Sequence, residues 1–114
     1  MAKDKEKDDY FQSVYKIVKA IPKGKVTTYG HISNALGSKN KARVVGYALN
    51  AAINSDIPCH RVINRNGELS GSSHFATPTL MRELLQSEKI EFTDQVVNLK
   101  KHLWIPKEIK STIS

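Results

Sequence analysis

The sequence predicts one mainly α-helical domain with a small β-hairpin, of the winged helix-turn-helix type. Its 114 residues are enough for a single modest hydrophobic core. Apolar residues recur at helical spacing in four segments, and a short turn that contains glycine joins the second segment to the third. An Asn-Gly pair, which is a strong hairpin signal, follows in the second half of the chain.

The first nine residues carry charges of both signs and no apolar segment. Three lysines stand against four acidic residues there, so this stretch has a net charge of −1 and the rest of the chain has +8. We expect a disordered tail over residues 1–9, a folded domain over 10–106 and a loose tail over 107–114. With no signal peptide or membrane span in the sequence, we expect a soluble, monomeric cytoplasmic protein, on the nucleoid when bound to DNA, or a nuclear one in a eukaryote.

The basic charge of the folded part has two explanations, and charge alone leaves both open. The domain attracts nucleic-acid phosphates over long distances, or its lysine-rich surface only keeps it soluble. The one cysteine excludes an internal disulfide. Without a Cys-x-x-Cys pair, the four scattered histidines give no zinc pattern, so no metal is expected.

The first two helices are expected over residues 9–20 and 29–36. The first ends before Pro22 and Gly24, and the second has Thr28 as its N-cap and ends at Gly37. Between them, residues 25–28 form a short extended link. The apolar face of the first helix consists of Tyr10, Phe11, Val14, Tyr15, Ile17, Val18 and Ile21.

The third helix is expected over residues 41–54 and has two different faces. At 100° per residue, Val45, Ala48, Leu49 and Ala52 share one face, and Arg43, Gly46, Tyr47, Asn50 and Asn54 share the opposite one. A glycine in mid-helix costs about 1 kcal/mol relative to alanine, and on an exposed face it lets another surface approach the backbone. Either this polar face is only solvated, or the helix is a recognition helix in which Arg43 and Asn50 donate to DNA.

The second half of the chain predicts a turn, a polar loop and a fourth helix. Residues 64–67 (Asn-Arg-Asn-Gly) form the turn, and residues 68–75 form a loop rich in glycine and serine. Thr77 as N-cap and Pro78 at the first helical position open the fourth helix, which ends near Glu88. Its buried stripe is Leu80, Met81, Leu84 and Leu85. Apolar and polar residues alternate weakly over residues 90–99, as in a short strand or hairpin. Residues 103–106 (Leu-Trp-Ile-Pro) are expected to close the core.

Residues 57–63 (Ile-Pro-Cys-His-Arg-Val-Ile) contain the only cysteine of the chain, Cys59. A lone cysteine is usually a small buried hydrophobe. Pro58, however, fits a strand end or a sharp turn, and His60 and Arg61 add a proton acceptor and a fixed positive charge next in sequence. Such surroundings make a cysteine nucleophilic where the side chains reach it.

Three stretches together resemble the DNA-binding domain of the O6-alkylguanine-DNA alkyltransferases and their shorter alkyltransferase-like relatives. They are residues 24–30 (Gly-Lys-Val-Thr-Thr-Tyr-Gly), 42–46 (Ala-Arg-Val-Val-Gly) and 57–63. The similarity runs from about residue 10 to 104, and the combination of Pro-Cys-His-Arg-Val with an upstream Ala-Arg-x-Val-Gly helix is specific. The resemblance implies a helix-turn-helix that docks in the DNA minor groove and rotates an alkylated guanine out of the stack.

The resemblance implies a role for each matched residue of the reactive site. Cys59 matches the alkyl acceptor, His60 the histidine that takes the thiol proton through a water, and Glu88 the carboxylate that orients this histidine. A thiolate is the soft nucleophile that removing an alkyl group from an ether oxygen requires. The product is a thioether, so such a protein acts once and needs no cofactor.

The resemblance also implies a DNA-binding set. Arg43 matches the arginine finger that fills the gap in the duplex, and Tyr29 matches the tyrosine that presses on the target phosphate. Arg61 resembles a structural support of the reactive site and is included in the expected DNA-binding set. The remaining members are Ala42, Gly46, Tyr47 and Asn50. The expected partners are double-stranded DNA with alkylated guanine and nucleotide excision repair proteins.

The sequence departs from the full repair enzymes in several places. It has only the charged stretch where they have an N-terminal domain, and residues 71–76 replace their Gly-Tyr-x-Gly-Gly type loop over the flipped base. Because the chain is one residue shorter between Arg43 and Cys59, Asn50 and Asn54 are both candidates for the family's asparagine upstream of the cysteine. Length, loop and chain ending resemble the alkyltransferase-like proteins, which usually have tryptophan or alanine at the position of Cys59.

Three functions remain open at this point. The first is a compact, single-use DNA alkyltransferase with Cys59 as acceptor, which the complete Cys59, His60 and Arg61 set favours. The second is a non-enzymatic sensor that binds alkylated guanine and recruits excision repair. The third is a helix-turn-helix module with no preference for damaged DNA.

Overall fold

The computed structural model describes residues 2–38 and 40–108, with side chains from residue 8 onward. Its elements confirm the expected mainly α-helical class with a small antiparallel strand pair. In chain order they are α1 (Ala2–Ala20), β1 (Thr27–Thr28), α2 (Tyr29–Ala35), α3 (Ala42–Ala51), the 3₁₀ helix η1 (Cys59–Arg61), β2 (Val62–Ile63), the 3₁₀ helix η2 (Ser72–His74), α4 (Leu80–Ser87), β3 (Phe92–Thr93), β4 (Val96–Val97) and α5 (Leu99–His102).

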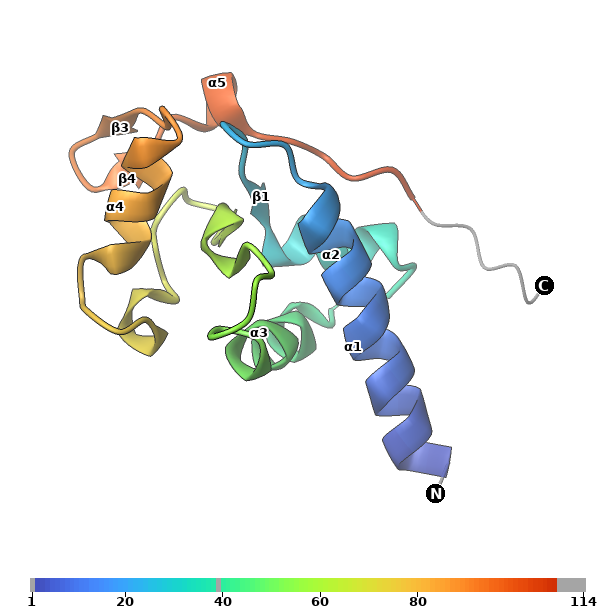
Figure 1. Ribbon diagram of the computed structural model, residues 1–114. Coiled ribbons are helices and arrows are strands. Elements are labelled where there is room, and N and C mark those ends of the chain that lie inside the picture. The colour runs from blue at the N-terminus through green and yellow to red at the C-terminus, as the bar shows by residue number, and fades with distance from the viewer. Residues whose placement is uncertain (1, 39, 109–114) are drawn as a thin grey trace.

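Helix α1 is the longest element, and its C-terminal half packs against the helix-turn-helix (Figure 1). It begins at Ala2, seven residues earlier than expected, so residues 2–9 are helical and do not form the expected tail. Alanine, lysine and glutamate are good helix formers, which explains the longer helix. At the other end of the chain, residues 109–114 of the expected loose tail lie outside the described residues.

Helices α2 and α3 form the expected helix-turn-helix. The Thr28 side chain caps α2 by accepting from the backbone N–H of His31 at 3.1 Å, and Gly37 leaves the helix with a φ of 73°. Helix α3 ends at Ala51, earlier than the expected residue 54, because the N–H of Ala52 bonds three residues back, to the carbonyl of Leu49. Asn54 therefore lies in the turn after the helix.

Strand β2 pairs in parallel with β1, which the sequence did not indicate. Thr27 faces Val62 and Thr28 faces Ile63 in this register. Because the two strands run in the same direction, η1 lies at the end where β1 begins and α2 leaves at the other end, and the pairing joins the cysteine segment to the helix-turn-helix.

The turn at residues 64–67 is present, but it does not join the two strands of the hairpin. The N–H of Gly67 bonds to the carbonyl of Asn64 at 3.0 Å, and Gly67 has a φ of 83°. The antiparallel pair is β3 and β4, within the stretch 90–99 where a strand or hairpin was expected. The turn docks on this pair, because the N–H of Val97 donates to the carbonyl of Gly67 at 2.9 Å. A Cβ at position 67 would lie 2.7 Å from Val96 Cγ1, so only glycine fits.

Helix α4 begins at Leu80, with Thr79 as N-cap, and not at the expected Thr77-Pro78. Residues 77–79 form a turn that the N–H of Leu80 closes on the carbonyl of Thr77 at 3.3 Å. The Thr79 hydroxyl donates to Glu83 at 2.6 Å, so it does not cap the helix backbone. The helix ends at Glu88 as expected.

Two apolar clusters form the core, and β2 lies between them. One cluster joins α1, α2, α3 and η1 and includes Val62; the other joins α4 to the β3–β4 pair and includes Ile63. Adjacent strand residues point to opposite sides, so two neighbouring residues serve two clusters. Figure 1 shows the corresponding arrangement, with α1–α3 on one side and α4, β3 and β4 on the other.

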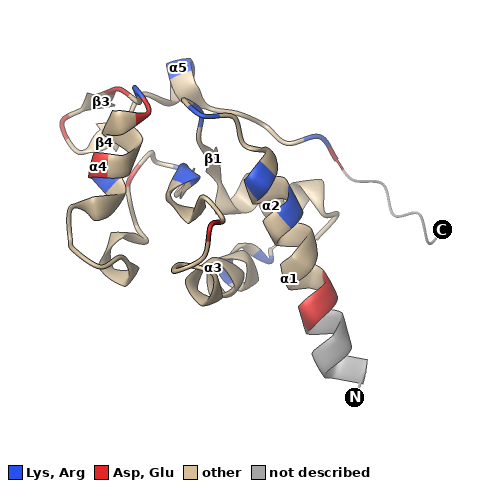
Figure 2. Ribbon diagram, viewed as in Figure 1, with Lys and Arg blue, Asp and Glu red and all other residues tan. Residues whose placement is uncertain are grey.

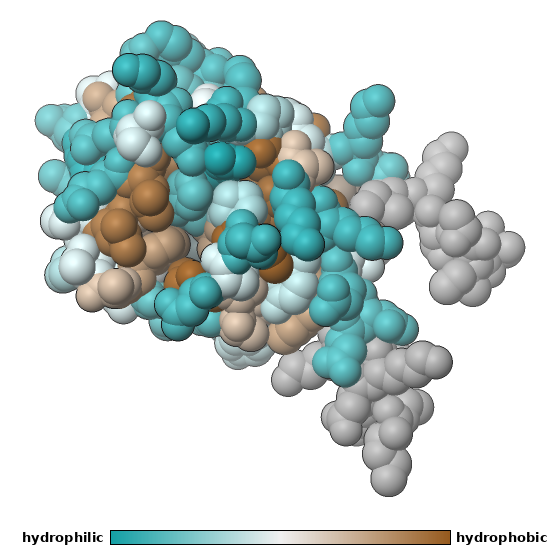
Figure 3. Space-filling model, in the orientation of Figure 1, coloured by the Kyte–Doolittle hydropathy of each residue, from teal (hydrophilic) through white to brown (hydrophobic). Residues whose placement is uncertain are grey.

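Basic and apolar side chains also reach the surface. Lys and Arg lie along the C-terminal half of α1 and on α3 (Figure 2). On the face in Figure 3, apolar side chains surface in patches bordered by polar ones. Tyr47 on α3 is 54% exposed, which is unusual for an aromatic residue and marks the outer face of this helix.

No helix of the described residues has the length and apolar character that a bilayer crossing requires.

The C-terminal segment returns to the start of the fold and closes it. Leu103 pairs with Val26, and the N–H of Trp104 donates to the carbonyl of Val26 at 2.7 Å. The buried His102 ring joins two further segments, with Nε2 accepting from the N–H of Glu91 at 2.9 Å and Nδ1 donating to the carbonyl of Gly24 at 3.0 Å. A neutral imidazole with its proton on Nδ1 satisfies both partners.

We expect His102→Leu to lower the free energy of unfolding by roughly 2–4 kcal/mol, because it leaves two backbone groups without partners. Urea unfolding monitored by circular dichroism measures this change. Lys100→Ala, an exposed change on the same helix, is the control and should shift stability by less than about 0.5 kcal/mol. Equal stability of both variants would contradict the assigned role of His102.

Candidate functional site

Glu88 is the centre of a hydrogen-bonded group behind the cysteine. Its Oε2 accepts from His60 Nε2 and from Arg61 Nη2, both at 2.8 Å, and its Oε1 accepts from Arg61 Nε at 2.9 Å. Arg61 also donates from Nη1 to the carbonyl of Ile21 at 3.0 Å. The expected contact between His60 and Glu88 is therefore present. Arg61 supports this group, and its guanidinium is bound inside the protein; its place in the DNA-binding set stays a prediction.

The surroundings of Glu88 determine the charge and the tautomer in this group. Burial alone would raise the pKa of Glu88, but the hydrogen bonds from Arg61 and His60, together with their charges, lower it below its ordinary value. The ionised carboxylate only accepts, so His60 Nε2 is the donor. In the neutral ring, Nδ1 then carries the free lone pair.

Cys59 begins η1, directly after Pro58, and its side chain is 5% exposed. Its Sγ donates to the carbonyl of Leu49 at 3.6 Å, so the thiol points at the backbone of α3. Burial raises the pKa of the thiol to about 11. At neutral pH the sulfur is therefore protonated in the free protein, and the expectation of a buried cysteine and that of a turn at Pro58 are both met.

Cys59, His60 and Arg61 together line a pocket of about 350 Å³, to which Phe75 and Leu84 also contribute. Cys59 and His60 thus border the same space. Burial raises the pKa of the Tyr29 phenol. A negative charge on Cys59 would raise it further, which places Tyr29 near the sulfur.

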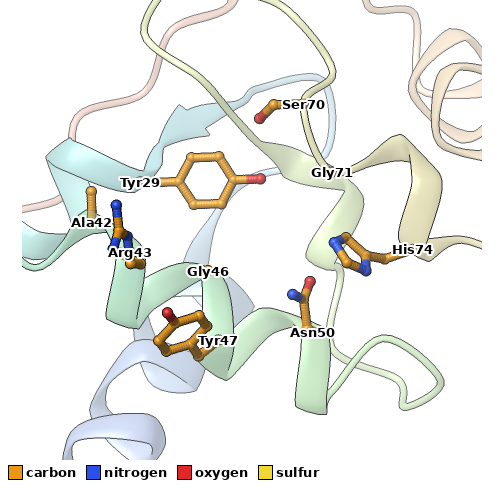
Figure 4. A pocket seen from close by; sticks show the side chains of 9 residues that line it. All are labelled: Tyr29, Ala42, Arg43, Gly46, Tyr47, Asn50, Ser70, Gly71 and His74. Atoms are coloured by element: carbon orange, nitrogen blue, oxygen red, sulfur yellow. The ribbon is translucent and has the colours of Figure 1, made fainter.

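A second pocket, of about 390 Å³, lies between α3 and the loop that contains η2 (Figure 4). Five of the expected DNA-binding residues line it: Tyr29, Ala42, Arg43, Gly46 and Tyr47. Asn50, the sixth, projects into it from the last turn of α3, whereas Asn54 does not line it. The structure thus brings together every expected member of the DNA-binding set except Arg61.

Helix α3 shows both of its expected faces, and residues of its outer face line the second pocket. Val45, Ala48 and Leu49 are buried on the core side, next to the sulfur, and Arg43, Tyr47 and Asn50 are exposed on the outer side. An ideal Cβ on Gly46 meets no heavy atom within 4 Å, so the outer wall is open at this point. The guanidinium and the thiol therefore lie on two sides of one helix.

Three pocket residues were not singled out from the sequence: Ser70, Gly71 and His74. Burial raises the pKa of Tyr29 and the nearby Ser70 side chain partly offsets this rise, and a Cβ on Gly71 would lie 3.1 Å from the Tyr29 hydroxyl. The resemblance matched residues 71–76 to the family's loop over the flipped base, but no role was assigned to these three residues, because loop residues carry no periodic pattern that assigns them to a surface. Within the described residues, no three His, Cys, Asp or Glu side chains gather as metal ligands would.

The family model described as "6-O-methylguanine DNA methyltransferase, DNA binding domain" matches residues 9–90. The chain belongs to this family. It is 33% identical to alkyltransferase-like protein 1 of Schizosaccharomyces pombe over 105 residues, which are 87% of this chain and 97% of the relative. It is 49% identical to the DNA base-flipping protein of Escherichia coli over 67 residues, which are 57% of this chain and 52% of that protein.

Solved structures of the family have the same fold. The S. pombe Atl1 complex with damaged DNA that contains O6-carboxymethylguanine superimposes with a TM-score of 0.75 at 34% identity, over 87% of this chain and 97% of that chain. Mycobacterium tuberculosis OGT in complex with DNA gives a TM-score of 0.65 at 36% identity, over 71% of this chain and 50% of that one. The family also includes methylated-DNA–protein-cysteine methyltransferases, such as the Methanosarcina acetivorans protein, which is 42% identical over 58% of this chain and 43% of its own length.

We expect the free energy of unfolding to fall as pH drops below about 4.5, and Glu88→Gln to flatten this fall. The pKa of Glu88 is lowered in the folded state, so its stabilisation is present above the unfolded value of 4.5 and is lost as pH falls through the folded pKa. Urea unfolding at a series of pH values from about 3 to 7 measures both curves.

Glu91→Gln is the matched control for this measurement. Glu91 also has a lowered pKa, through its hydrogen bond to Lys101, but it is exposed, so solvent and salt weaken its effect. If the fall in the free energy of unfolding at low pH persists in Glu88→Gln and disappears in Glu91→Gln, then Glu91, and not Glu88, causes it.

Proposed function

We propose that this protein binds DNA through α3, rotates an O6-alkylated guanine out of the duplex and transfers the alkyl group to Cys59. The observation that carries the proposal is the hydrogen-bonded group of His60, Glu88 and Arg61 directly after the cysteine. A cysteine that served only as packing would not need an oriented imidazole on the next residue of the chain. The chemistry named in the relatives, on alkylated guanine in DNA, is the chemistry that this group supports.

The DNA-binding part of the proposal rests on the outer face of α3. Arg43 and Tyr47 are exposed there, next to a pocket that Tyr29 and Asn50 also line. A base inside a duplex cannot present its O6 substituent to a buried sulfur, so flipping is required, at a cost of a few kcal/mol. The Arg43 side chain entering the vacated space offsets part of this cost.

The transfer itself needs a base, because burial keeps the thiol protonated at neutral pH. His60 Nδ1 carries a free lone pair and takes the thiol proton through a water, since Nε2 is held by Glu88. The Sγ–carbon bond then forms as the bond between carbon and O6 breaks. The purine leaves with the electron pair of that bond and takes up a proton to become guanine, and the thioether remains on the protein.

A second function, the non-enzymatic lesion sensor, is favoured by two observations. The sulfur is almost fully buried and has a pKa of about 11, and the chain spans nearly the whole length of alkyltransferase-like protein 1. In this case the protein flips the same base and holds it, and the bound protein marks the lesion for excision repair proteins. The two functions share α3 and differ only in the fate of Cys59.

The mass of the protein after incubation with a duplex containing O6-methylguanine distinguishes the two functions. We expect a gain of one CH₂ group, located on Cys59 by peptide mass spectrometry and absent in Cys59→Ser. Selective binding of the damaged duplex without any gain in mass would support the sensor. Equal binding of damaged and undamaged duplexes would reject both and leave a helix-turn-helix module without lesion preference.

We expect Arg43→Ala to weaken binding to duplex DNA by about tenfold or more, and wild-type affinity to fall steeply with salt. Fluorescence anisotropy at two or more salt concentrations measures both effects. Lys100→Ala on α5 removes an equal charge far from α3 and serves as the control. Unchanged binding by Arg43→Ala would show that the outer face of α3 does not contact DNA.

A further inference from the structure

His74 lines the pocket, but the proposed function gives its imidazole no role. It ends η2 and lines the same pocket as Tyr29, Arg43 and Asn50. In Figure 4 its imidazole projects from the loop toward the pocket, with the Asn50 side chain below it and the Tyr29 hydroxyl pointing in from α2. Three polar groups from three separate elements therefore face one hollow.

The backbone holds His74 in this position before any ligand arrives. The N–H of His74 donates to the carbonyl of Gly71 at 3.1 Å, and the N–H of Phe75 donates to the carbonyl of Ser72 at 3.2 Å. Phe75, the next residue, packs against both apolar clusters of the core. The imidazole is thus exposed at the end of an anchored turn, which lowers the entropy lost when it binds.

The walls around these polar groups leave room for a flat ring. Gly46 adds no side chain on the α3 side, and Gly71 brings the loop backbone close to the Tyr29 hydroxyl. A purine offers ring nitrogens that accept and an amino group that donates at its edge. Imidazole and carboxamide groups can donate to some of these atoms and accept from others, which suits them to reading such an edge.

We propose that His74 hydrogen-bonds to the edge of the flipped purine and is a specificity-determining residue of this protein. The assignment rests on the proposed function, because it requires that a base enters the pocket. His74 contacts the base and not the DNA backbone, so it contributes to the affinity for damaged duplex and not to the affinity for DNA in general.

The test measures dissociation constants in a Cys59→Ser background, in which no alkyl transfer can consume the complex. Two duplexes of equal sequence are compared, one with O6-methylguanine and one with guanine at the same position. We expect His74→Ala to weaken binding to the damaged duplex by about three- to tenfold, the effect of one lost hydrogen bond, and to leave the undamaged duplex within about twofold. His74→Gln, which keeps a donor and an acceptor, should retain part of the preference.

Two controls separate this assignment from its alternatives. Ser73→Ala changes the exposed neighbour that does not line the pocket and should alter neither constant. Arg43→Ala should weaken both duplexes. Equal weakening of both duplexes by His74→Ala would make His74 a backbone contact, and no change in either would remove it from the interface; each result overturns the assignment.

The Cys59→Ser protein without further changes, called the parent below, shows whether the proposed function itself has failed. A Cys59→Ser parent that binds both duplexes equally would overturn the proposed base flipping and the His74 assignment with it. A parent that prefers the damaged duplex, combined with an unchanged preference in His74→Ala, would overturn the His74 assignment alone.

Discussion

A single carboxylate holds the reactive part of this fold together. Glu88 stands at the end of α4 and receives three hydrogen bonds from the two residues that follow the cysteine, and Arg61 extends the group to the carbonyl of Ile21 after α1. Three segments that are distant in sequence thus meet at one charged group. Because a buried carboxylate without partners is costly, this group also determines which way η1 faces and where the thiol lies.

The position of the thiol has two opposite effects on its chemistry. Burial against the carbonyl of Leu49 keeps the sulfur protonated and protects it from adventitious oxidants and alkylating agents in solution. The same burial lowers its nucleophilicity until a base accepts the proton. Under the proposed alkyl transfer, a protein that acts only once benefits from this arrangement, since the sulfur is not consumed before the lesion is in place.

The sequence allowed the helix-turn-helix, the two faces of α3 and the cap at Thr28 to be predicted, because each depends on local periodicity or a local hydrogen bond. It also brought Cys59, His60 and Glu88 into one hypothesis, although only through resemblance to a family. The parallel pairing of β1 with β2 could not be predicted, because two-residue strands carry no pattern of their own. The late start of α4 had a similar cause, since Thr77-Pro78 is a good start signal that the Thr79 contact to Glu83 overrides.

Residues of the polar loop were equally hard to assign. Ser70, Gly71 and His74 line the pocket only because the loop folds over Tyr29, and composition gives no direction to a loop side chain. Arg61 shows the converse case. A basic residue in a DNA-binding protein is naturally counted toward DNA, yet its guanidinium is bound to Glu88 and to a backbone carbonyl.

The anchoring of Gly67 has an evolutionary consequence. Its carbonyl is fixed to β4, and a side chain there would collide with Val96, so the polypeptide is firmly tied just before the loop. Phe75 ties it again on the far side of η2. Insertions, deletions and substitutions between Gly67 and Phe75 would change the loop side of the pocket next to α3 and leave the hydrophobic core intact. The loop can therefore change in length and sequence without loss of the fold.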